Sequence, residues 1–324
     1  MSHDVLKNHT PEPSVVAIGV FDGVHRGHQM LISKLVEAAR ARNIRSVVVT
    51  FDPHPATVLA PHAAPQLIET VRQRCEHLRY LGVDEVLVLP FDVTASQEEA
   101  VDFVDRVLVN LLRSAHVVIG EDFRFGRERF GDVRRLTQWG GERGFSVESV
   151  SLVGDGERFS STAVRAALSR GDIAEAERIL GHAVVLEGSV IHGDARGGAE
   201  LGFPTANLEL VSTQIIPGTG IYAGASCLPS GEWKASAISV GTRPQFYDGG
   251  ELLVEVFVVN FSGNLYGEEL RTVFLERLRG EMTFPSVDEL VEQMSRDVGQ
   301  ATLIFEEFSP SEETLLAFPF GQRR

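Results

Sequence analysis

The sequence predicts an N-terminal α/β domain with a doubly wound parallel sheet, followed by a C-terminal antiparallel β domain that ends in a helix. The chain has 324 residues, more than one ordinary hydrophobic core organises. Segments typical of strands and of helices alternate from residue 14 to about residue 182. Beyond that point, strand-like runs are separated by glycine, proline or asparagine turns. We therefore expect two domains, 1–182 and 183–324, with the boundary near 182–186.

The first domain is expected to contain five buried strands separated by helical patterns. The predicted strands are 14–20, 45–51, 84–91, 115–120 and 145–153, and the predicted helices are 28–42, 71–82, 96–113 and 130–144. One face of the first helix is apolar (Leu31, Leu35, Ala38, Ala39), and Ser96 is the expected N-cap of the third helix. Such alternation implies parallel strands, whose ligands bind beyond the carboxyl ends of the strands.

The second half of the chain changes character after two short helices, which are expected within 158–182 and end at Gly181. The strand-like runs that follow are 184–193, 220–228, 233–241, 252–261 and 270–278. Their spacing is typical of an antiparallel barrel or sandwich. Residues 286–300 predict an amphipathic helix with a capping box of Ser286 and Glu289, and the tail from Phe305 is left without an assignment.

The composition limits the classes of partner that we expect. The net charge is −15 and the pI is about 5.1, which disfavours bulk nucleic-acid binding and adhesion to an anionic membrane. The two cysteines, Cys75 and Cys227, lie far apart in the sequence and predict no disulfide framework, so a reducing cytoplasm is expected. No apolar run is long enough to span a bilayer, and residues 1–13 contain no apolar signal core. We expect small-molecule substrates and a monomer or weak homo-oligomer.

The segment 14–29 (SVVAIGVFDGVHRGHQ) is the most informative part of the chain, because it places two histidines in a strand-to-helix turn. His25 and His28 are separated only by Arg26 and Gly27. A helix N-terminus offers backbone N–H groups and a positive dipole end, so we interpret this turn as a phosphate site. A metal site with His54 as the third ligand is the alternative, disfavoured because no carboxylate or cysteine repeats at ligand spacing.

Two other segments of the first domain also point to anions or nucleotides. In RFSSTAVR (158–165), hydroxyl groups at a helix N-terminus are flanked by Arg158 and Arg165, which favours a second anion site in addition to an ordinary helix cap. In GEDFRFG (120–126), Asp122 lies in a loop after a buried strand. It is either a turn residue or a contact to a nucleotide.

The second domain carries a glycine-rich loop within 188–210 that is followed by PTAN, with Thr205 and Asn207. Such a loop lets the backbone approach phosphates, although a flexible hairpin is the simpler interpretation. Glu255 lies within an apolar strand-like run, so it is either on an exposed face or a placed base. No Walker-type loop occurs, and GTGIYA (218–223) opens a strand rather than the helix that dinucleotide binding needs.

Taken together, these motifs resemble those of the prokaryotic bifunctional riboflavin kinase/FMN adenylyltransferase family, whose members are also called FAD synthetases. The resemblance covers residues 14–300 and rests on motifs in family order. GVFDGVHRGH, TFDPHP, GEDFRFG and RFSSTAVR resemble a Rossmann-like nucleotidyltransferase module. GDARGGAELGFPTAN, LLVEVFVVNFSGNLYG and LRGEMTFPS resemble a flavokinase barrel.

The resemblance implies two ATP-dependent steps, both with Mg²⁺: riboflavin is phosphorylated to FMN, and FMN is then adenylylated to FAD with release of pyrophosphate. It also implies in-line transfers without a covalent enzyme intermediate. A non-catalytic flavin- or nucleotide-binding regulator is the alternative, which the intact motifs disfavour. A nicotinamide oxidoreductase is disfavoured because the first turn lacks the glycine fingerprint.

The resemblance also implies residue roles. His25, His28, Arg165 and Glu255 would be catalytic, with Glu255 taking the proton of the ribityl 5′-hydroxyl. Thr205 and Asn207 would place Mg²⁺, and Asn207, Arg279 and Glu281 would contact the flavin. The residues implied in ATP binding are Gly19, Phe21, Asp22, Gly27, Asp122, Arg158, Ser161, Thr162, Gly188, Gly193, Gly198 and Gly202.

The chain departs from the family pattern at a few places. The glycine loop is longer than the family's by one residue, and Gln245 replaces a threonine. The last helix lacks the usual closing arginine pattern, and the tail from Phe305 is extra. None of these departures involves a residue that we assign to catalysis.

Overall fold

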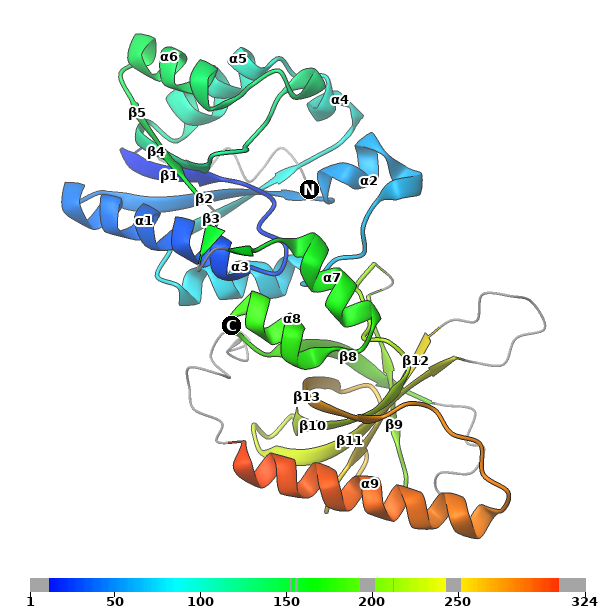
Figure 1. The fold of residues 1–324 in the computed structure, drawn as a ribbon. Coiled ribbons are helices and arrows are strands. Elements are labelled where there is room, and N and C mark those ends of the chain that lie inside the picture. Colours follow the sequence, from blue (N-terminus) through cyan, green and yellow to red (C-terminus); the bar gives the residue numbers. More distant parts are fainter. Residues whose placement is uncertain are drawn as a thin grey trace. The chain divides into compact units, whose positions relative to one another are not determined.

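The computed structural model describes residues 12–151, 153–154, 157–192, 202–211, 213–242 and 252–308. The chain divides into two compact units, residues 1–160 and 161–324 (Figure 1). The boundary between the two activities, expected near 182–186, stays a prediction, because compactness and activity need not divide a chain at the same residue.

The first unit is built on a five-stranded parallel sheet, as predicted. Its strands are β1 (Ser14–Ile18), β2 (Arg45–Asp52), β3 (Glu85–Pro90), β4 (Ser114–Gly120) and β5 (Ser146–Val150), in the order β3-β2-β1-β4-β5. Every neighbouring pair is parallel. The chain order reverses between β1 and β4, so the carboxyl ends of these strands are where a ligand is expected.

Helices cover both faces of this sheet. They are α1 (Arg26–Arg42), α2 (Pro55–Leu59), α3 (Val71–Tyr80), α4 (Val93–Ser96), α5 (Ala100–Phe103) and α6 (Val133–Arg143), with shorter turns η1 (Pro61–Ala63) and η3 (Arg127–Arg129) and a π-helix η2 (Val104–Leu111). A short hairpin, β6 (Val153–Gly154) and β7 (Glu157–Arg158), follows.

The alternation of β1 side chains divides the core into two clusters. Val15 and Ala17 pack in a cluster with Leu31 of α1 and Leu78 of α3. Residues 16 and 18 pack on the other face, in a cluster with the π-helix and α6. All five residues of β1 are buried, so this strand lies in the middle of a two-sided core.

The third helix differs from the prediction. Ser96 is the last residue of α4 and not the N-cap of a long helix. Asp92 caps α4 instead, because its carboxylate accepts a hydrogen bond from the Ala95 N–H at 2.8 Å. A new helix, α5, begins at Ala100 and continues as the π-helix from Val104. The Ser96 prediction was wrong because an earlier side chain satisfies the helix start.

The second unit begins with α7 (Ser161–Ser169) and α8 (Ile173–Leu180), which confirms the two short helices and the glycine end at Gly181. Its strands are β8 (Val184–Ile191), β9 (Ala206–Glu209), β10 (Gly220–Cys227), β11 (Trp233–Thr242), β12 (Leu252–Val258) and β13 (Glu269–Arg279). They form a closed barrel in the order β10-β11-β12-β9-β8-β13 with antiparallel pairs. The barrel is thus confirmed over the sandwich.

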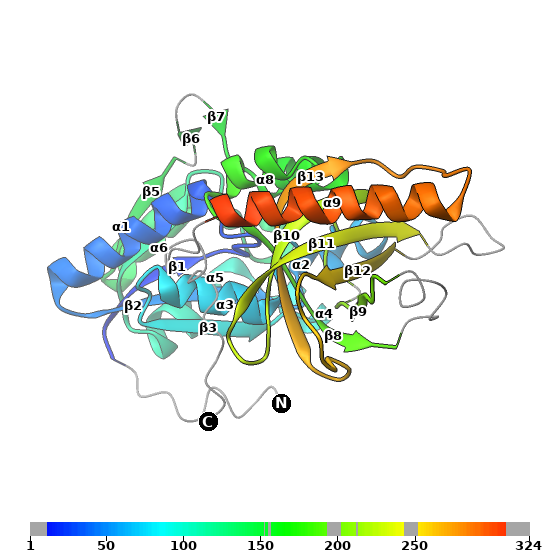
Figure 2. The same cartoon turned by 90° about the horizontal axis from the view of Figure 1, so that it is seen from below.

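The last described element is α9 (Val287–Glu307), which lies against β10, β11 and β13 of the barrel (Figure 2). Ser286 is its N-cap and accepts from the Glu289 N–H at 3.2 Å. The N-cap is as predicted, but the Glu289 side chain does not bond to the Ser286 N–H to complete the capping box. The helix continues beyond residue 300 to Glu307. The tail residues 309–324 lie outside the described residues.

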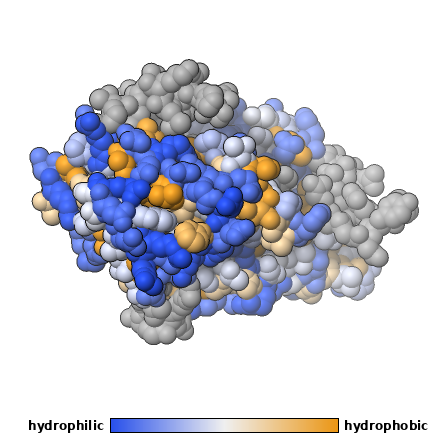
Figure 3. Space-filling view, turned by 90° about the horizontal axis from the view of Figure 1, so that it is seen from above, coloured by the Kyte–Doolittle hydropathy of each residue, from blue (hydrophilic) through white to orange (hydrophobic). Residues whose placement is uncertain are grey.

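On the face drawn in Figure 3, the described residues are mostly hydrophilic, and hydrophobic residues form only small groups. Among the helices that the structure describes, none combines the length and apolar character needed to cross a membrane.

Replacing each of two glycines in the second unit by alanine is expected to change the free energy of unfolding in opposite directions. A Cβ at Gly224 of β10 would lie 2.6 Å from the Val273 carbonyl oxygen, whereas a Cβ at Gly299 of α9 would meet nothing within 4 Å. We expect Gly224→Ala to lower the free energy of unfolding by about 1–3 kcal/mol through overpacking. Gly299→Ala should raise it by about 1 kcal/mol, because alanine favours a helix. Urea unfolding of both variants measures this, and equal effects of the two changes would contradict it.

Candidate functional site

The first candidate site is the turn between β1 and α1, whose backbone is unusually folded. Phe21, Gly23 and Val24 have φ angles of 54°, 78° and 32°, in the left-handed region. Phe21 and Val24 are also buried, so the turn is held by packing as well as by hydrogen bonds. Non-glycine residues in this region cost free energy and are concentrated at functional sites.

His25 and His28 lie together at the start of α1. Their rings stack with centroids 3.6 Å apart, and the edge of Phe21 approaches His28 at 5.2 Å between ring centroids. His25 is the N-cap of α1: its Nδ1 accepts the His28 N–H at 3.3 Å. His25 is 3% exposed, and His28 Nδ1 is buried without a hydrogen-bond partner among the described residues. The structure thus brings the predicted pair together, and their role toward a phosphate stays a prediction.

The environment of His28 favours its neutral form. Burial is the largest cause that lowers its pKa well below 6.5, and electrostatic interactions with His25, Arg74 and His77 lower it further. A neutral imidazole offers one N–H donor and one acceptor nitrogen. His28 is therefore suited to donate a hydrogen bond near neutral pH, while the positive charge comes from other groups.

The alternative of a three-histidine metal site gains no support. His54 is the N-cap of α2, and its Nδ1 accepts the Ala56 N–H at 3.1 Å. Within the described part of the chain, His25, His28 and His54 do not form a cluster of metal-ligating atoms.

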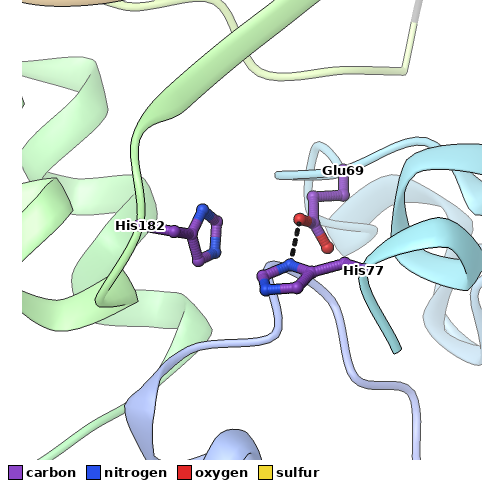
Figure 4. Close-up of side chains that lie close together, drawn as sticks. All are labelled: Glu69, His77 and His182. Carbon is purple, nitrogen blue, oxygen red and sulfur yellow. Dashed lines mark hydrogen bonds and ion pairs between the residues drawn. The ribbon is translucent and has the colours of Figure 1, made fainter. Parts of the chain in front are cut away.

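Asp22 connects the turn by hydrogen bonds to the segment that precedes α3. Its Oδ1 accepts the backbone N–H groups of Ile68 at 3.0 Å and Glu69 at 3.1 Å, and its side chain is buried. Figure 4 shows the neighbouring buried pair, in which the Glu69 carboxylate bonds to His77 Nδ1 at 3.1 Å. Asp22 was expected to contact ATP; what the structure describes is a carboxylate that orients the turn.

A cavity of about 570 Å³ opens beyond the carboxyl ends of β1, β2, β3 and β4. Gly19 and Val20 of the histidine turn line one part of it. The remaining wall is largely aromatic and carries charges of both signs. The aromatic residues are Phe51, Phe91, Phe103, Phe123 and Phe125, and the charged residues are Arg106, Arg124, Arg129, Glu98 and Glu128. Arg106 is paired with Glu98 at 2.7 Å. Phe123 and Phe125 stack at 5.4 Å between centroids. A flat, apolar ring with a charged substituent suits such a wall.

The sequence reasoning missed this cavity. It singled out Asp122 in GEDFRFG, which is exposed and does not line the cavity, while the phenylalanines on either side of Arg124 do. The available signal was the position of aromatic residues at, or shortly after, the ends of buried parallel strands, as at Phe51, Phe91 and Phe123.

The other residues predicted in the first domain are placed as follows. Gly19 donates its N–H to the Val49 carbonyl at 3.1 Å, and Gly27 is buried in the first turn of α1. Ser161, Thr162 and Arg165 lie in the first turns of α7, in the second compact unit. Arg158 belongs to β7, and its side chain lies outside the described residues. The joint action of these groups with the histidines stays a prediction.

The second candidate site lies on the barrel, where β9 and β12 pair. Asn207 is directly opposite Glu255 in the register, and Thr205 Oγ1 lies 3.5 Å from Glu255 Oε1. Asn207 is 6% exposed, and its Oδ1 is buried without a partner among the described residues. A buried, unsatisfied oxygen is costly and calls for a partner. The three oxygens fit the hard oxygen ligands that Mg²⁺ prefers.

Other residues predicted in the second domain have structural contacts. A Cβ at Gly188 would lie 2.6 Å from the Glu209 carbonyl oxygen, so this glycine lets β8 approach β9 closely. Arg279 forms an ion pair with Asp297 of α9 at 2.7 Å. Glu281 Oε1 lies 3.2 Å from the position of a Cβ at Gly241. Gly202 has a φ of +87°, and Gly193 and Gly198 lie outside the described residues.

Comparisons with known proteins find matches to both parts of the chain. Residues 7–163 match a family model described as FAD synthetase, and residues 180–305 match one described as riboflavin kinase. The bifunctional riboflavin kinase/FMN adenylyltransferase of Escherichia coli (strain K12) is 39% identical over 288 residues, 88% of this chain and 91% of the relative. That of Pseudomonas fluorescens is 39% identical over 299 residues, 91% of this chain and 95% of the relative. A crystal structure described as a macrolide-efflux protein from Streptococcus pneumoniae has a TM-score of 0.82 and 31% identity, covering 94% of this chain and 97% of that chain.

The buried pair beneath the turn makes stability depend on pH. Burial lowers the pKa of His77 from 6.5 to about 4, so this imidazole is neutral in the folded chain. Between those values the unfolded chain binds a proton that the folded chain does not, so stability is lost as pH falls. We expect a loss of about 2 kcal/mol between about pH 7.5 and about pH 5 from this group. Urea unfolding of His77→Gln should show a smaller loss, and of the exposed His62→Gln an unchanged one. The same loss in His77→Gln as in wild type would contradict this account.

Proposed function

The chain belongs to the bifunctional riboflavin kinase/FMN adenylyltransferase family, and from that premise we propose that it makes FAD from riboflavin in two Mg²⁺-dependent steps at two separate sites. Riboflavin and ATP give FMN and ADP at the barrel, and FMN and ATP give FAD and pyrophosphate at the α/β unit. The single observation that carries this proposal is the pairing of each activity with its own complete group of side chains. The stacked His25–His28 pair follows Gly19 and Val20, which line the aromatic cavity, and Glu255 lies beside Thr205 on the barrel.

The adenylyl transfer is proposed to proceed in line. An oxygen of the FMN phosphate attacks the α-phosphorus of ATP, and pyrophosphate leaves on the opposite side, so no covalent enzyme intermediate forms. The N-terminus of α1, His25 and His28 stabilise the charge that develops on the α-phosphate. Ser161, Thr162 and Arg165 hold the β- and γ-phosphates, with Arg158 nearby.

The aromatic cavity is the proposed site of the isoalloxazine ring. Its phenylalanines offer faces and edges for stacking, and Arg124 and Arg129 offer charge for the phosphate, whereas Arg106 is already paired with Glu98. Gly19 and Val20 line the cavity and also open the histidine turn, which supports an arrangement that holds the FMN phosphate beside the ATP phosphates. Catalysis is then mostly positioning, as is usual for transfers of this kind.

The kinase step is proposed to use Glu255 as the general base. Glu255 takes the proton of the ribityl 5′-hydroxyl, which attacks the γ-phosphorus while ADP leaves. Thr205 and Asn207 would hold Mg²⁺, which when bound supplies charge neutralisation on the transferred phosphoryl group. The unsatisfied Oδ1 of Asn207 supports this assignment.

The remaining roles are proposed from the family. Phe21, Asp22, Gly27, Asp122 and the glycines at 19, 188, 193, 198 and 202 would contact ATP or shape its site. Asn207, Arg279 and Glu281 would contact the flavin. Cys75 and Cys227 are free and buried, which is compatible with the reducing cytoplasm where we place both reactions. We propose a monomer or weak homo-oligomer that acts on small molecules and binds neither nucleic acid nor membranes.

Single substitutions should separate the two activities. His28→Ala should lower FAD formation at least about 100-fold and leave FMN formation within about twofold, because only the adenylyl transfer loses a charge-stabilising donor. Glu255→Gln should lower FMN formation by a similar factor and leave FAD formation from supplied FMN unchanged. Flavins are separated by chromatography after incubation with ATP and Mg²⁺. If one well-folded variant lost both FMN formation from riboflavin and FAD formation from supplied FMN, the two sites would not be independent.

Metal removal tests the Mg²⁺ requirement. Wild-type protein treated with a chelator and desalted should form neither FMN from riboflavin nor FAD from FMN, because triphosphate charge is then not neutralised. Added Mg²⁺ should restore both products. Undiminished formation of either product in the metal-free protein would show that the corresponding step does not need the ion.

A further inference from the structure

Arg74 of α3 is a buried cation without an acidic partner. Its side chain is 2% exposed, and it is among the largest fully buried side chains. A charged residue is almost never fully buried unless it is paired. In the described ranges of this chain, no carboxylate forms an ion pair with Arg74, and its Nε–H is buried without an acceptor. The chain therefore retains a costly group that its own acidic residues do not neutralise.

The two hydrogen bonds of Arg74 join the ends of two strands. One Nη donates to the Val20 carbonyl at 2.7 Å, and the other donates to the Phe51 carbonyl at 3.0 Å. These acceptors lie 54 and 23 residues away in the sequence. Val20 belongs to the histidine turn, whereas Phe51 is at the end of β2, and both residues line the aromatic cavity. One guanidinium thus sets the separation between the turn and the cavity wall.

The charge of Arg74 also reaches the paired imidazoles. It is one of three groups whose electrostatic interaction lowers the pKa of His28; the others are His25 at the N-cap of α1 and His77 on α3, which is bonded to Glu69. An arginine keeps its charge at every physiological pH, unlike a histidine. Arg74 therefore places a permanent, buried positive charge near the imidazole of His28, whose neutral form is favoured by burial.

We propose that Arg74 is a positioning residue for adenylyl transfer. It holds the histidine turn and the cavity wall at the separation that the two substrates need, and it supplies a fixed positive charge to the ATP phosphates. The triphosphate provides the negative charge that no carboxylate of the described chain provides. This inference rests on the proposed function of the α/β unit, and it adds a residue to which no role in that reaction had been assigned.

Steady-state kinetics of FAD formation from FMN and ATP test the inference. We expect Arg74→Met to lower kcat about 100-fold, the scale of a small misplacement of reacting groups, with a smaller change in the KM for FMN. Arg74→Lys keeps the charge but cannot bond both carbonyls in a fixed fork. Its kcat should therefore lie between the kcat of the wild-type protein and that of Arg74→Met. Arg79→Met removes the same charge from the exposed part of α3 and should behave as wild type. Riboflavin phosphorylation by the same proteins should be unchanged.

The pH profile provides a readout that a purely structural role would not move. Loss of the Arg74 charge should raise the pKa of His28, so the acid limb of kcat should shift to higher pH in Arg74→Met and stay in place in Arg74→Lys. A wild-type kcat and an unshifted limb in Arg74→Met would overturn the inference. If thermal unfolding shows that Arg74→Met does not fold, wild-type kcat and KM in Arg74→Lys would overturn it instead. Absence of FAD formation by the wild-type protein would instead overturn the proposed function itself.

Discussion

The carbonyl oxygen of Val20 is the point on which the α/β site depends. It accepts hydrogen bonds from two side chains, Arg74 of α3 and Thr50 of β2, at 2.7 Å and 3.0 Å. Just beyond this residue the chain enters left-handed backbone conformations and then starts α1. A buried carbonyl must be satisfied, and here the satisfaction comes from side chains because β1 has already ended. The position of His25 and His28 thus follows from a hydrogen bond several residues before them.

The barrel site depends on a different constraint, the register of two strands. Because side chains alternate along a strand, Asn207 and Glu255 share a face only while β9 and β12 keep their pairing. A slip of one residue would send one of them to the opposite face. The close approach of β8 to β9, which only a glycine at position 188 permits, lies next to this pair. A residue assigned to ATP by family resemblance therefore also has a packing role that by itself would keep it a glycine.

Much of this architecture could be predicted because it follows from the local periodicity of hydrophobic residues. The alternation of strands and helices specified a parallel sheet, and the turn-separated runs specified an antiparallel barrel or sandwich. What could not be predicted depends on contacts between distant residues. Ser96 looked like a helix start, yet Asp92 caps an earlier turn. The role of Arg74 could not be predicted from the sequence, because its hydrogen-bond acceptors are backbone carbonyls, which every residue has. Asp22 was assigned to ATP through the family resemblance, and nothing in the sequence indicated that its carboxylate accepts the amides of Ile68 and Glu69.

The two sites solve the problem of phosphate charge in different ways. In the barrel, hydroxyl, amide and carboxylate oxygens are gathered, and such a set is neutral or negative, so it needs a cation to bind a phosphate. In the α/β unit, the low pKa of His28 favours its neutral form near neutral pH, so positive charge for a phosphate has to come from other groups. Arg74 meets that need without facing the solvent. A buried guanidinium bonded only to carbonyls keeps most of its charge available to an anion, whereas one paired with a carboxylate would be neutralised already. The absence of an acidic partner in the described structure is thus what makes this arginine effective toward a triphosphate.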